Sequence, residues 1–549
     1  MKNNLRLFLY AATFGVAFII WQKWQEANVP FYQQVDNSVI QQENTAQSLA
    51  ILPAPASSLA ALPANIVDSV GSQNTTSFVN VHTDVMNIVI NLQGGTIERV
   101  ELLDYSQTKQ NKAPLDLLKT HNPGRFLLQS GLGSNSQAPD HYSKFSATQQ
   151  QFSLGQGENI LEVPLTWQND QGIVVTKTYT FKRDSYDFEL SQQVQNHGVD
   201  DWEGFAYQQL VFGEPVSRGG IGQVYTFTGG VTSTAEDSYN KIDLKEMRKL
   251  PISLQTSEGW VAMIQHYFLG AIVPKTEGIY NFYTNFNQGD HIIGVSSEKK
   301  LVVPNASAEF VATGYVGPKV QERLSQVAPK LDKTVDYGVL FMIAQPMFKV
   351  LSFIYDLIGN WGWAIIVMTL LIKLIFFAPS AWAYKSMAKM RRLQPEMARM
   401  KERYGEDRQA MSQAMMKLYR DEKVNPASGC VPMLLQIPFF IAFYWVLVES
   451  VELRHASWIG WVQDLSTRDP YFILPIINAA LMFIQQKLNP PPPDPMQAKL
   501  MMILPLVFGF MFMWFPSGLV LYWTVSNAFS IVQQYIMNKR YGEPKVKKV

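Results

Sequence analysis

Residues 359–384 read GNWGWAIIVMTLLIKLIFFAPSAWAY, an apolar run of membrane-crossing length that holds a single charged residue, Lys373. In a straight helix Trp361 and Lys385, twelve residues to either side, would each lie roughly 18 Å from it. We therefore expect Lys373 near the middle of a bilayer. The other membrane-length runs contain no Asp or Glu to pair with it. An ammonium at that depth needs water or a bound polar partner, which makes Lys373 a candidate functional residue.

Five apolar runs in the C-terminal third predict transmembrane helices. They span residues 361–383, 430–448, 471–487, 500–515 and 517–537. A sixth span is predicted within residues 1–24, an uncleaved signal anchor, because Gln22 and Lys23 follow the apolar run where a cleavage site would need small residues. The third and fourth runs, of about 15–17 residues, are short for a hydrocarbon core of about 30 Å and imply local thinning or water entry.

Residues 76–335 predict an all-β domain. Short alternating runs such as 173–181 and 309–316 are typical of strands, and Gly, Asn and Asp separate them. Many strands of this length without intervening helices favour a large β-sandwich. The preceding residues, 25–75, are rich in Gln, Asn, Ser, Ala and Pro and predict a flexible linker. Residues 336–358 predict an amphipathic helix that lies along the membrane surface.

The distribution of basic residues predicts the orientation of the chain in the membrane. Residues 385–423 hold 11 Lys and Arg against 6 Asp and Glu, a net charge of +5, and predict a cytoplasmic helical hairpin. The basic tail, 541–549, is expected on the same side, and the more acidic loop at 449–469 on the other. Six spans with both termini in the cytoplasm satisfy these constraints. The β domain is then periplasmic in the inner membrane of a Gram-negative cell.

Polar residues of three predicted helices are candidates to share a site with Lys373. Thr369 lies one turn before it on the same helix face. Gln436 lies inside the second apolar run of the C-terminal third. Spacings of three and four place further polar residues on one stripe of the last run: Tyr522, Ser526, Ser530 and Gln533. For any one of these residues, a structural role in hydrogen bonding between helices fits equally well. Their convergence on one lysine favours a polar groove.

Signatures of enzymes are absent from the sequence. No HExxH or GxSxG motif occurs, and the seven histidines are scattered, so we predict no catalytic residues, no metal site and no cofactor. The single cysteine, Cys430, is more typical of a small buried apolar residue than of a reactive thiol.

Several motifs of the C-terminal third resemble the YidC/Oxa/Albino family of membrane insertases. They are GNWGW at 359–363, YKSMAKM at 384–390, LQP at 393–395, EKVNP at 422–426, GC at 429–430, QIP at 436–438 and FPSGL at 515–519. The resemblance covers residues 337–540. The anchor and the large domain behind it resemble the Gram-negative form of the family.

The resemblance implies a membrane protein insertase and chaperone that acts alone or with the Sec translocon. Its partners would be nascent membrane proteins, ribosome–nascent chain complexes and lipids, with no small-molecule substrate. It implies a five-helix insertase core within 359–540 and a periplasmic β-supersandwich like that of sugar mutarotases. The implied client-binding groove residues are Lys373, Thr369, Gln436, Tyr522, Trp523 and Ser526. The family usually has arginine where this chain has Lys373, which keeps the charge but loses the bidentate fork.

Two other functions fit parts of the sequence. A secondary transporter would use Lys373 as a solute or proton site, but such transporters commonly show internal repeats and none occurs among the core runs. A membrane-anchored periplasmic carbohydrate-binding protein would depend mainly on residues 76–316. No nucleotide-binding motif is present, so client hydrophobicity and the membrane potential would have to drive insertion.

Overall fold

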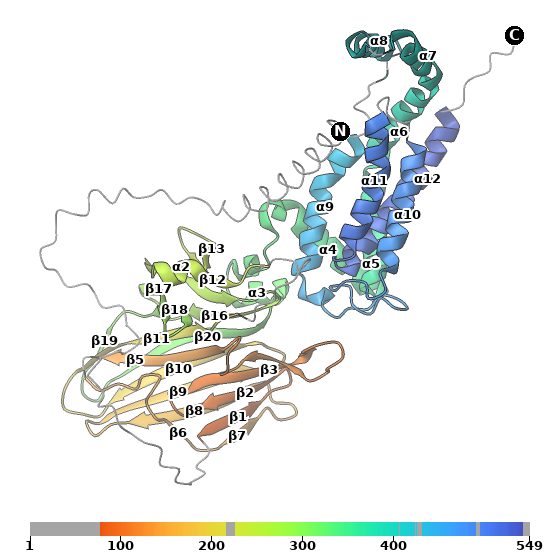
Figure 1. Cartoon of the computed structure of the whole chain (residues 1–549). Coiled ribbons are helices and arrows are strands. Elements are labelled where there is room, and N and C mark those ends of the chain that lie inside the picture. The colour runs from red at the N-terminus through yellow and green to blue at the C-terminus, as the bar shows by residue number, and fades with distance from the viewer. Residues whose placement is uncertain are drawn as a thin grey trace, which may run out of the picture.

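The computed structural model describes residues 77–134, 136–215, 226–405, 407–422, 424, 431–489 and 495–541. The first part of the described chain forms β-sheets, and the C-terminal third forms a bundle of helices beside them (Figure 1). The predicted anchor at 1–24, the linker at 25–75 and Cys430 lie outside the described residues, as does the tail beyond Tyr541.

The strands form two large sheets. An eleven-stranded sheet contains β1 (Phe78–His82), β2 (Met86–Asn91), β3 (Thr96–Ser106), β4 (Pro114–Leu118), β5 (Phe126–Ser134), β7 (Gln151–Ser153), β11 (Trp202–Phe212), β14 (Ser253–Thr256), β17 (Tyr280–Asn287), β18 (Asp290–Ser296) and β19 (Lys300–Val302). A nine-stranded sheet contains β6 (Ser146–Ala147), β8 (Ile160–Gln168), β9 (Ile173–Lys182), β10 (Asp187–Asn196), β12 (Gly229–Thr234), β13 (Asn240–Asp243), β15 (Gly259–Ile264), β16 (Phe268–Pro274) and β20 (Ser307–Pro318).

The long strands of the nine-stranded sheet follow the alternation of the sequence. Strands β8, β9, β10 and β20 lie side by side in that order and pair antiparallel. Every second residue of β9 and β10 is buried, as a period of two requires when one face meets the core. The strands predicted at 173–181 and 309–316 are therefore confirmed.

The two sheets pack face to face around an apolar core. Phe126 and Leu210 of the eleven-stranded sheet and Val261 and Ile272 of the nine-stranded sheet are all 1% exposed or less. Gly270 on β16 lies where the two sheets approach closely, since a Cβ atom there would lie 2.9 Å from the Phe126 ring and 3.0 Å from Leu210. That contact is tighter than carbon atoms tolerate, so the sheets need glycine at this position.

One lysine crosses this core. The Lys177 ammonium, on β9, donates to the carbonyl of Gly94 (2.6 Å) and to that of Ser130 on β5 (3.0 Å), and lies 4.6 Å from the centre of the Phe145 ring. It therefore bridges the two sheets. Burial lowers the pKa of Lys177 from 10.5 to about 7, because the charged form has lost its water, and the charge of Asp140 opposes this only in part.

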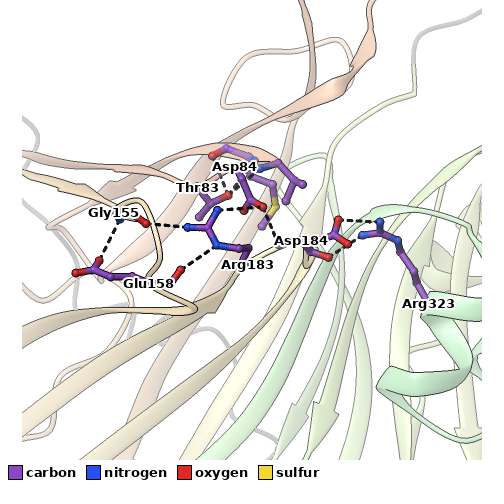
Figure 2. Close-up of polar contacts among 9 residues, drawn as sticks. Thr83, Asp84, Gly155, Glu158, Arg183, Asp184 and Arg323 are labelled. Atoms are coloured by element: carbon purple, nitrogen blue, oxygen red, sulfur yellow. Dashed lines mark hydrogen bonds and ion pairs between the residues drawn. The ribbon is translucent and has the colours of Figure 1, made fainter.

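A polar cluster fastens α3 (Gln321–Val327) to the edge of the sheets (Figure 2). Arg183, in the turn after β9, donates to the carbonyls of Gly155 (2.8 Å) and Glu158 (2.9 Å). The next residue, Asp184, accepts from Arg323 on α3 through its carboxylate and its carbonyl, both at 2.9 Å. These side chains are at least one-third exposed, so the cluster orients α3 and adds little stability.

The other helices are α2 (Leu244–Lys249), α4 (Phe341–Ile358), α5 (Trp361–Ile375), α6 (Phe377–Arg392), α7 (Gln394–Tyr404), α8 (Arg408–Asp421), α9 (Val431–Glu449), α10 (Ile473–Leu488), α11 (Pro495–Phe512) and α12 (Ser517–Tyr541). Short 3-10 turns occur at Leu331–Thr334, Gly338–Leu340 and Val451–Leu453. In the described residues, one helix, Gly338–Ile358, is long and apolar enough to cross a membrane, and α5 with α6 qualifies if the bent pair is one span. Helices α9, α10 and α11 include shorter apolar stretches.

The run at 361–383 is not one straight helix. Helix α5 ends at Ile375, and α6 follows at an angle of 65°. Pro379 explains the break, because it has no N–H for the Ile375 carbonyl and its ring would collide with that carbonyl in a continuous helix. Lys373 therefore lies in the last turn of α5, and the straight-helix distance to Lys385 does not hold.

The hairpin predicted within 385–423 turns between α7 and α8, at the end of the helical part farthest from the sheets (Figure 1). Gly405 takes a positive φ of 52° there, and the Asp407 carboxylate caps α8 by accepting from the backbone N–H groups of Gln409 and Ala410. A small apolar cluster joins the two arms through Leu393, Leu418, Tyr419 and Val424, with Met390, Met397, Met400 and Met415 packed against it. These methionines thus form the seam between the arms.

We predict that Lys177 makes the stability of the β domain depend on pH. The unfolded chain keeps the Lys177 proton up to about pH 10.5, whereas the folded chain releases it near pH 7. The free energy of unfolding should therefore rise between pH 7 and pH 9, by about 2 kcal/mol. Urea unfolding of the full-length protein in detergent, followed by tryptophan fluorescence, measures this slope. Lys177→Met should remove it, and an unchanged slope in that variant would contradict the assignment.

Candidate functional site

Polar side chains from α5, α9 and α12 converge on Lys373. The ammonium donates to Gln436 Oε1 (3.0 Å) and to Ser530 Oγ (2.9 Å). The amide nitrogen of Gln436 in turn donates to Ser526 Oγ (2.9 Å) and to the Tyr522 hydroxyl (3.3 Å). One amide therefore links the lysine on α5 to two turns of α12. The polar residues of α9 and α12 therefore converge on Lys373, as their spacing in the sequence predicts.

The Lys373 cluster, meaning Lys373, Gln436, Tyr522, Ser526 and Ser530, carries an uncompensated positive charge. Lys373 is 9% exposed, and both of its acceptors are neutral oxygens. Within the residues that the structure describes, no carboxylate forms an ion pair with it. An ammonium has three N–H groups, so two acceptors leave one donor for another partner. The cluster can therefore attract an anion and donate a hydrogen bond to it.

Thr369 and Trp523 lie beside the Lys373 cluster without joining its hydrogen bonds. Thr369 is fully buried, and its hydroxyl donates to the Ile365 carbonyl of its own helix (2.6 Å). The Trp523 ring packs against Phe440 of α9 and Phe512 of α11, with ring centres 4.3 and 4.6 Å apart. Trp523 thus belongs to an apolar contact among α9, α11 and α12.

Gln533, the last residue of the predicted stripe, reaches the bend between α5 and α6. Its side-chain nitrogen donates to the Phe377 carbonyl at the start of α6 (2.9 Å). Gln533 is 4% exposed, so the contact is protected from water. It ties α12 to the bend that Pro379 creates, two residues into α6, and so helps to place the last turn of α5 beside α12.

Sequence analysis missed a second polar stripe on α12. It faces α10, where Asn527 donates to Asn478 (2.8 Å), Gln534 to Asn489 (2.8 Å) and Asn538 to the Leu488 carbonyl (3.3 Å). Asn478 and Gln534 are fully buried. The spacing of seven between Asn527 and Gln534, together with an asparagine inside the apolar run of α10, was the available signal. This stripe joins α10 to α12.

Two family models match the chain. Residues 78–350 match the YidC periplasmic domain, and residues 353–544 match the 60Kd inner membrane protein family. Among curated proteins, the membrane protein insertase YidC of Alkalilimnicola ehrlichii is 44% identical, and the alignment covers 97% of this chain and 95% of that protein. YidC of Nitrosococcus oceani is 42% identical, with coverage of 98% and 99%.

A solved structure described as active YidC insertase with the first transmembrane domain resolved is also similar. It is 19% identical, covers 85% of this chain and 93% of its own, and has a TM-score of 0.39.

We predict that Gln436→Leu destabilises the helical part. The substitution removes an acceptor from a buried ammonium and two hydrogen bonds to α12. The free energy of unfolding should fall by about 2 kcal/mol, the usual contribution of a hydrogen bond to a charged group. Unfolding in lipid nanodiscs, compared with the parent protein, measures the loss. Equal stability would show that water replaces the Gln436 oxygen at no cost.

Proposed function

The chain belongs to the YidC family of membrane protein insertases, and we propose that it acts on its clients through the positive charge of the Lys373 cluster. As a member of this family it is a membrane protein insertase of the inner membrane, with a periplasmic domain built mostly of β-sheet and a helical C-terminal part. Its clients are nascent membrane proteins. The family is one of insertases and is not a class of catalytic enzymes.

The proposal rests on one observation, a buried ammonium held by neutral oxygens alone. Carrying the polar tail of a client across a bilayer is costly, because its charged and amide groups lose water. Lys373 offers an acidic group an opposite charge, and the free N–H offers it a hydrogen bond. Before a client binds, the Gln436 and Ser530 oxygens hold the ammonium. A carboxylate binds an ammonium more strongly than either neutral oxygen does, so an acidic tail can displace them.

We propose that α5, α9 and α12 line a hydrophilic groove around this charge. Thr369 and Trp523 flank the Lys373 cluster on α5 and α12, where they would contact the client beside its acidic group. Entry of a client would separate Gln436 from Ser526 and Tyr522, since these hydrogen bonds join α9 to α12. The short helices α10 and α11, of 16 and 18 residues, would thin the bilayer beside the groove.

The proposed topology has six transmembrane helices, five of them in the insertase core, and both termini in the cytoplasm. Its parts are an anchor (1–24), a linker (25–75), a periplasmic β-supersandwich (76–335), an interfacial helix (336–358), the core (359–540) and a basic tail (541–549). The net charge of +5 in 385–423, most of it from Lys385, Lys389, Arg391 and Arg392 at the end of α6, would let this segment meet ribosomal RNA or anionic lipid, which supports action on ribosome–nascent chain complexes. We propose that the protein also acts with the Sec translocon.

We predict that Lys373→Ala impairs insertion of clients with acidic periplasmic tails, while Lys373→Arg is tolerated because the charge is retained. Loss of about 1.4 kcal/mol of attraction would slow insertion roughly tenfold. Protease protection of the tail in cells depleted of the native insertase measures the effect. A client with an uncharged tail is the control and should be much less affected. Full growth and full insertion with Lys373→Ala would rule out the mechanism.

A second variant separates loss of charge from loss of structure. Gln436→Glu places a carboxylate where the Gln436 oxygen accepts from Lys373, and an ion pair then replaces the uncompensated charge. We expect a folded protein that inserts acidic-tailed clients as poorly as Lys373→Ala does. The same protease-protection assay measures it. Normal insertion by a stable Gln436→Glu protein would show that the positive charge is not what the client meets.

A further inference from the structure

Two neighbouring residues in the middle of α12 bind two different helices. Ser526 accepts a hydrogen bond from the Gln436 amide of α9 (2.9 Å) and so belongs to the Lys373 cluster. The next residue, Asn527, donates to the Asn478 side chain of α10 (2.8 Å). Because successive residues of a helix project about 100° apart, one turn of α12 serves both neighbours at once. The groove side and the α10 side of this helix are therefore set together.

The same division recurs seven residues later on α12. Gln533 donates to the Phe377 carbonyl at the start of α6 (2.9 Å), and the next residue, Gln534, donates to Asn489, directly after α10 (2.8 Å). Seven residues are close to two full turns, so both contacts to α10 lie on one face of α12. We call the residues that make them the amide cluster: Asn478, Asn489, Asn527 and Gln534.

The amide cluster is sealed, and its hydrogen bonds are incomplete. Asn478 and Gln534 are 0% exposed. Among the described residues, Asn478 Nδ2 and Gln534 Oε1 have no hydrogen-bond partner. A buried polar atom without a partner lowers stability, so apolar side chains would make a more stable contact between α10 and α12. A polar residue inside a helix interface selects one register at a cost in stability. The amide cluster is therefore suited to fixing the position of α12.

The position of α12 decides whether the Lys373 cluster can form. A rotation of α12 that takes Asn527 away from Asn478 also swings Ser526 away from Gln436, since the two residues are adjacent on one rigid helix. Ser530, which accepts from Lys373, lies one turn after Ser526 and would move with it. Contacts on the α10 side thus aim the hydroxyls that face the lysine.

The two sides of α12 differ in how readily they part. On the α9 side, the partners of Gln436 are hydroxyls, which can rotate to bond a polar group of a client instead. On the α10 side, parting the helices would leave amides facing hydrocarbon without partners. Helix α11 is also held close to α10, because a Cβ atom at Gly509 would lie only 2.7 Å from Ala479 Cβ. Helices α10, α11 and α12 therefore form one unit.

We propose that the residues of the amide cluster are positioning residues, which hold α12 to α10 as the fixed side of the groove. A client then enters by parting α9 from α12, while Ser526 and Ser530 stay aimed at Lys373. The proposal rests on the function proposed for the Lys373 cluster. It adds which pair of helices opens, and which residues keep the other pair closed.

The first test measures two distances in the full-length protein in nanodiscs, after Cys430 is replaced by serine. Spin labels at Ile437 and Val532 report α9 against α12, and labels at Phe483 and Val532 report α10 against α12; all three residues are more than one-third exposed. The probe is a synthetic client peptide with an acidic tail before an apolar segment. Bound peptide should lengthen the first distance by several ångströms and leave the second unchanged. A longer second distance, or an unchanged first one, would overturn the proposal.

The second test links α10 to α12 covalently. In the double variant N478C/N527C, oxidation joins the two helices and reduction separates them; a protease site placed between α10 and α11 shows on a gel which form is present. The oxidised form should insert acidic-tailed clients within about twofold of the parent. The reduced form should insert them roughly tenfold less well, as should Asn478→Leu, in which the distance between Phe483 and Val532 should broaden.

The matched control is Thr524→Val, which removes a polar group of α12 that bonds only within its own helix, to the Val520 carbonyl (2.7 Å). It should change neither insertion nor the two distances. Poor insertion by the oxidised double variant would show that α10 and α12 must part, and full insertion by the reduced form would show that the amide cluster is not needed. If these variants do not accumulate, the peptide-induced distances in the parent decide.

Failure of the Lys373 mechanism is distinguishable from failure of this proposal. Lys373→Ala should reduce insertion while the distance between Phe483 and Val532 stays unchanged, because the amide cluster remains intact. A fully active Lys373→Ala protein would therefore sink the proposed function. The response of the two distances to the peptide, and of N478C/N527C to oxidation, would still show which pair of helices opens.

Discussion

The helical part of this protein is organised by the need to solvate one ammonium that has no carboxylate partner in the described structure. Two helices provide neutral oxygens in place of an anion: α9 provides Gln436, and α12 provides Ser530 and, through Gln436, the hydroxyls of Tyr522 and Ser526. Neutral oxygens hold the charge without cancelling it. A carboxylate in their place would make a more stable protein with nothing left to attract a client. Incomplete compensation is therefore the property on which the proposed mechanism depends.

The sequence predicts those features that local spacing determines. Alternation places β9 and β10, and the spacing of three and four places Ser526 and Ser530 on one face of α12. The break at Pro379 was readable in principle, since proline blocks the carbonyl four residues earlier. The continuous apolar run nevertheless predicted a single helix, because hydropathy measures how well side chains suit lipid and takes no account of backbone hydrogen bonds.

Contacts between distant parts of the chain could not be predicted. Lys319 and Glu449 form a buried ion pair but are 130 residues apart, and each is an ordinary charged residue beside an apolar stretch. Nothing in either local sequence shows that they meet, or that burial removes both from water. The same holds for Lys177, whose carbonyl partners lie on β5 and in the turn between β2 and β3. Such pairs depend on how whole helices and strands pack, and the spacing of residues along the chain does not predict that packing.

Among the residues that the structure describes, three lysines are buried in different surroundings, and the partners decide the role of each. Lys177 meets two carbonyls between sheets, where it bridges two strands and its charge is costly. Lys319 meets a carboxylate, which cancels its charge. Lys373 meets an amide and a hydroxyl, which hold its position and leave its charge in place. Burial alone would have assigned all three to structure; the nature of the acceptor separates Lys373, the lysine proposed to meet a client, from Lys177 and Lys319.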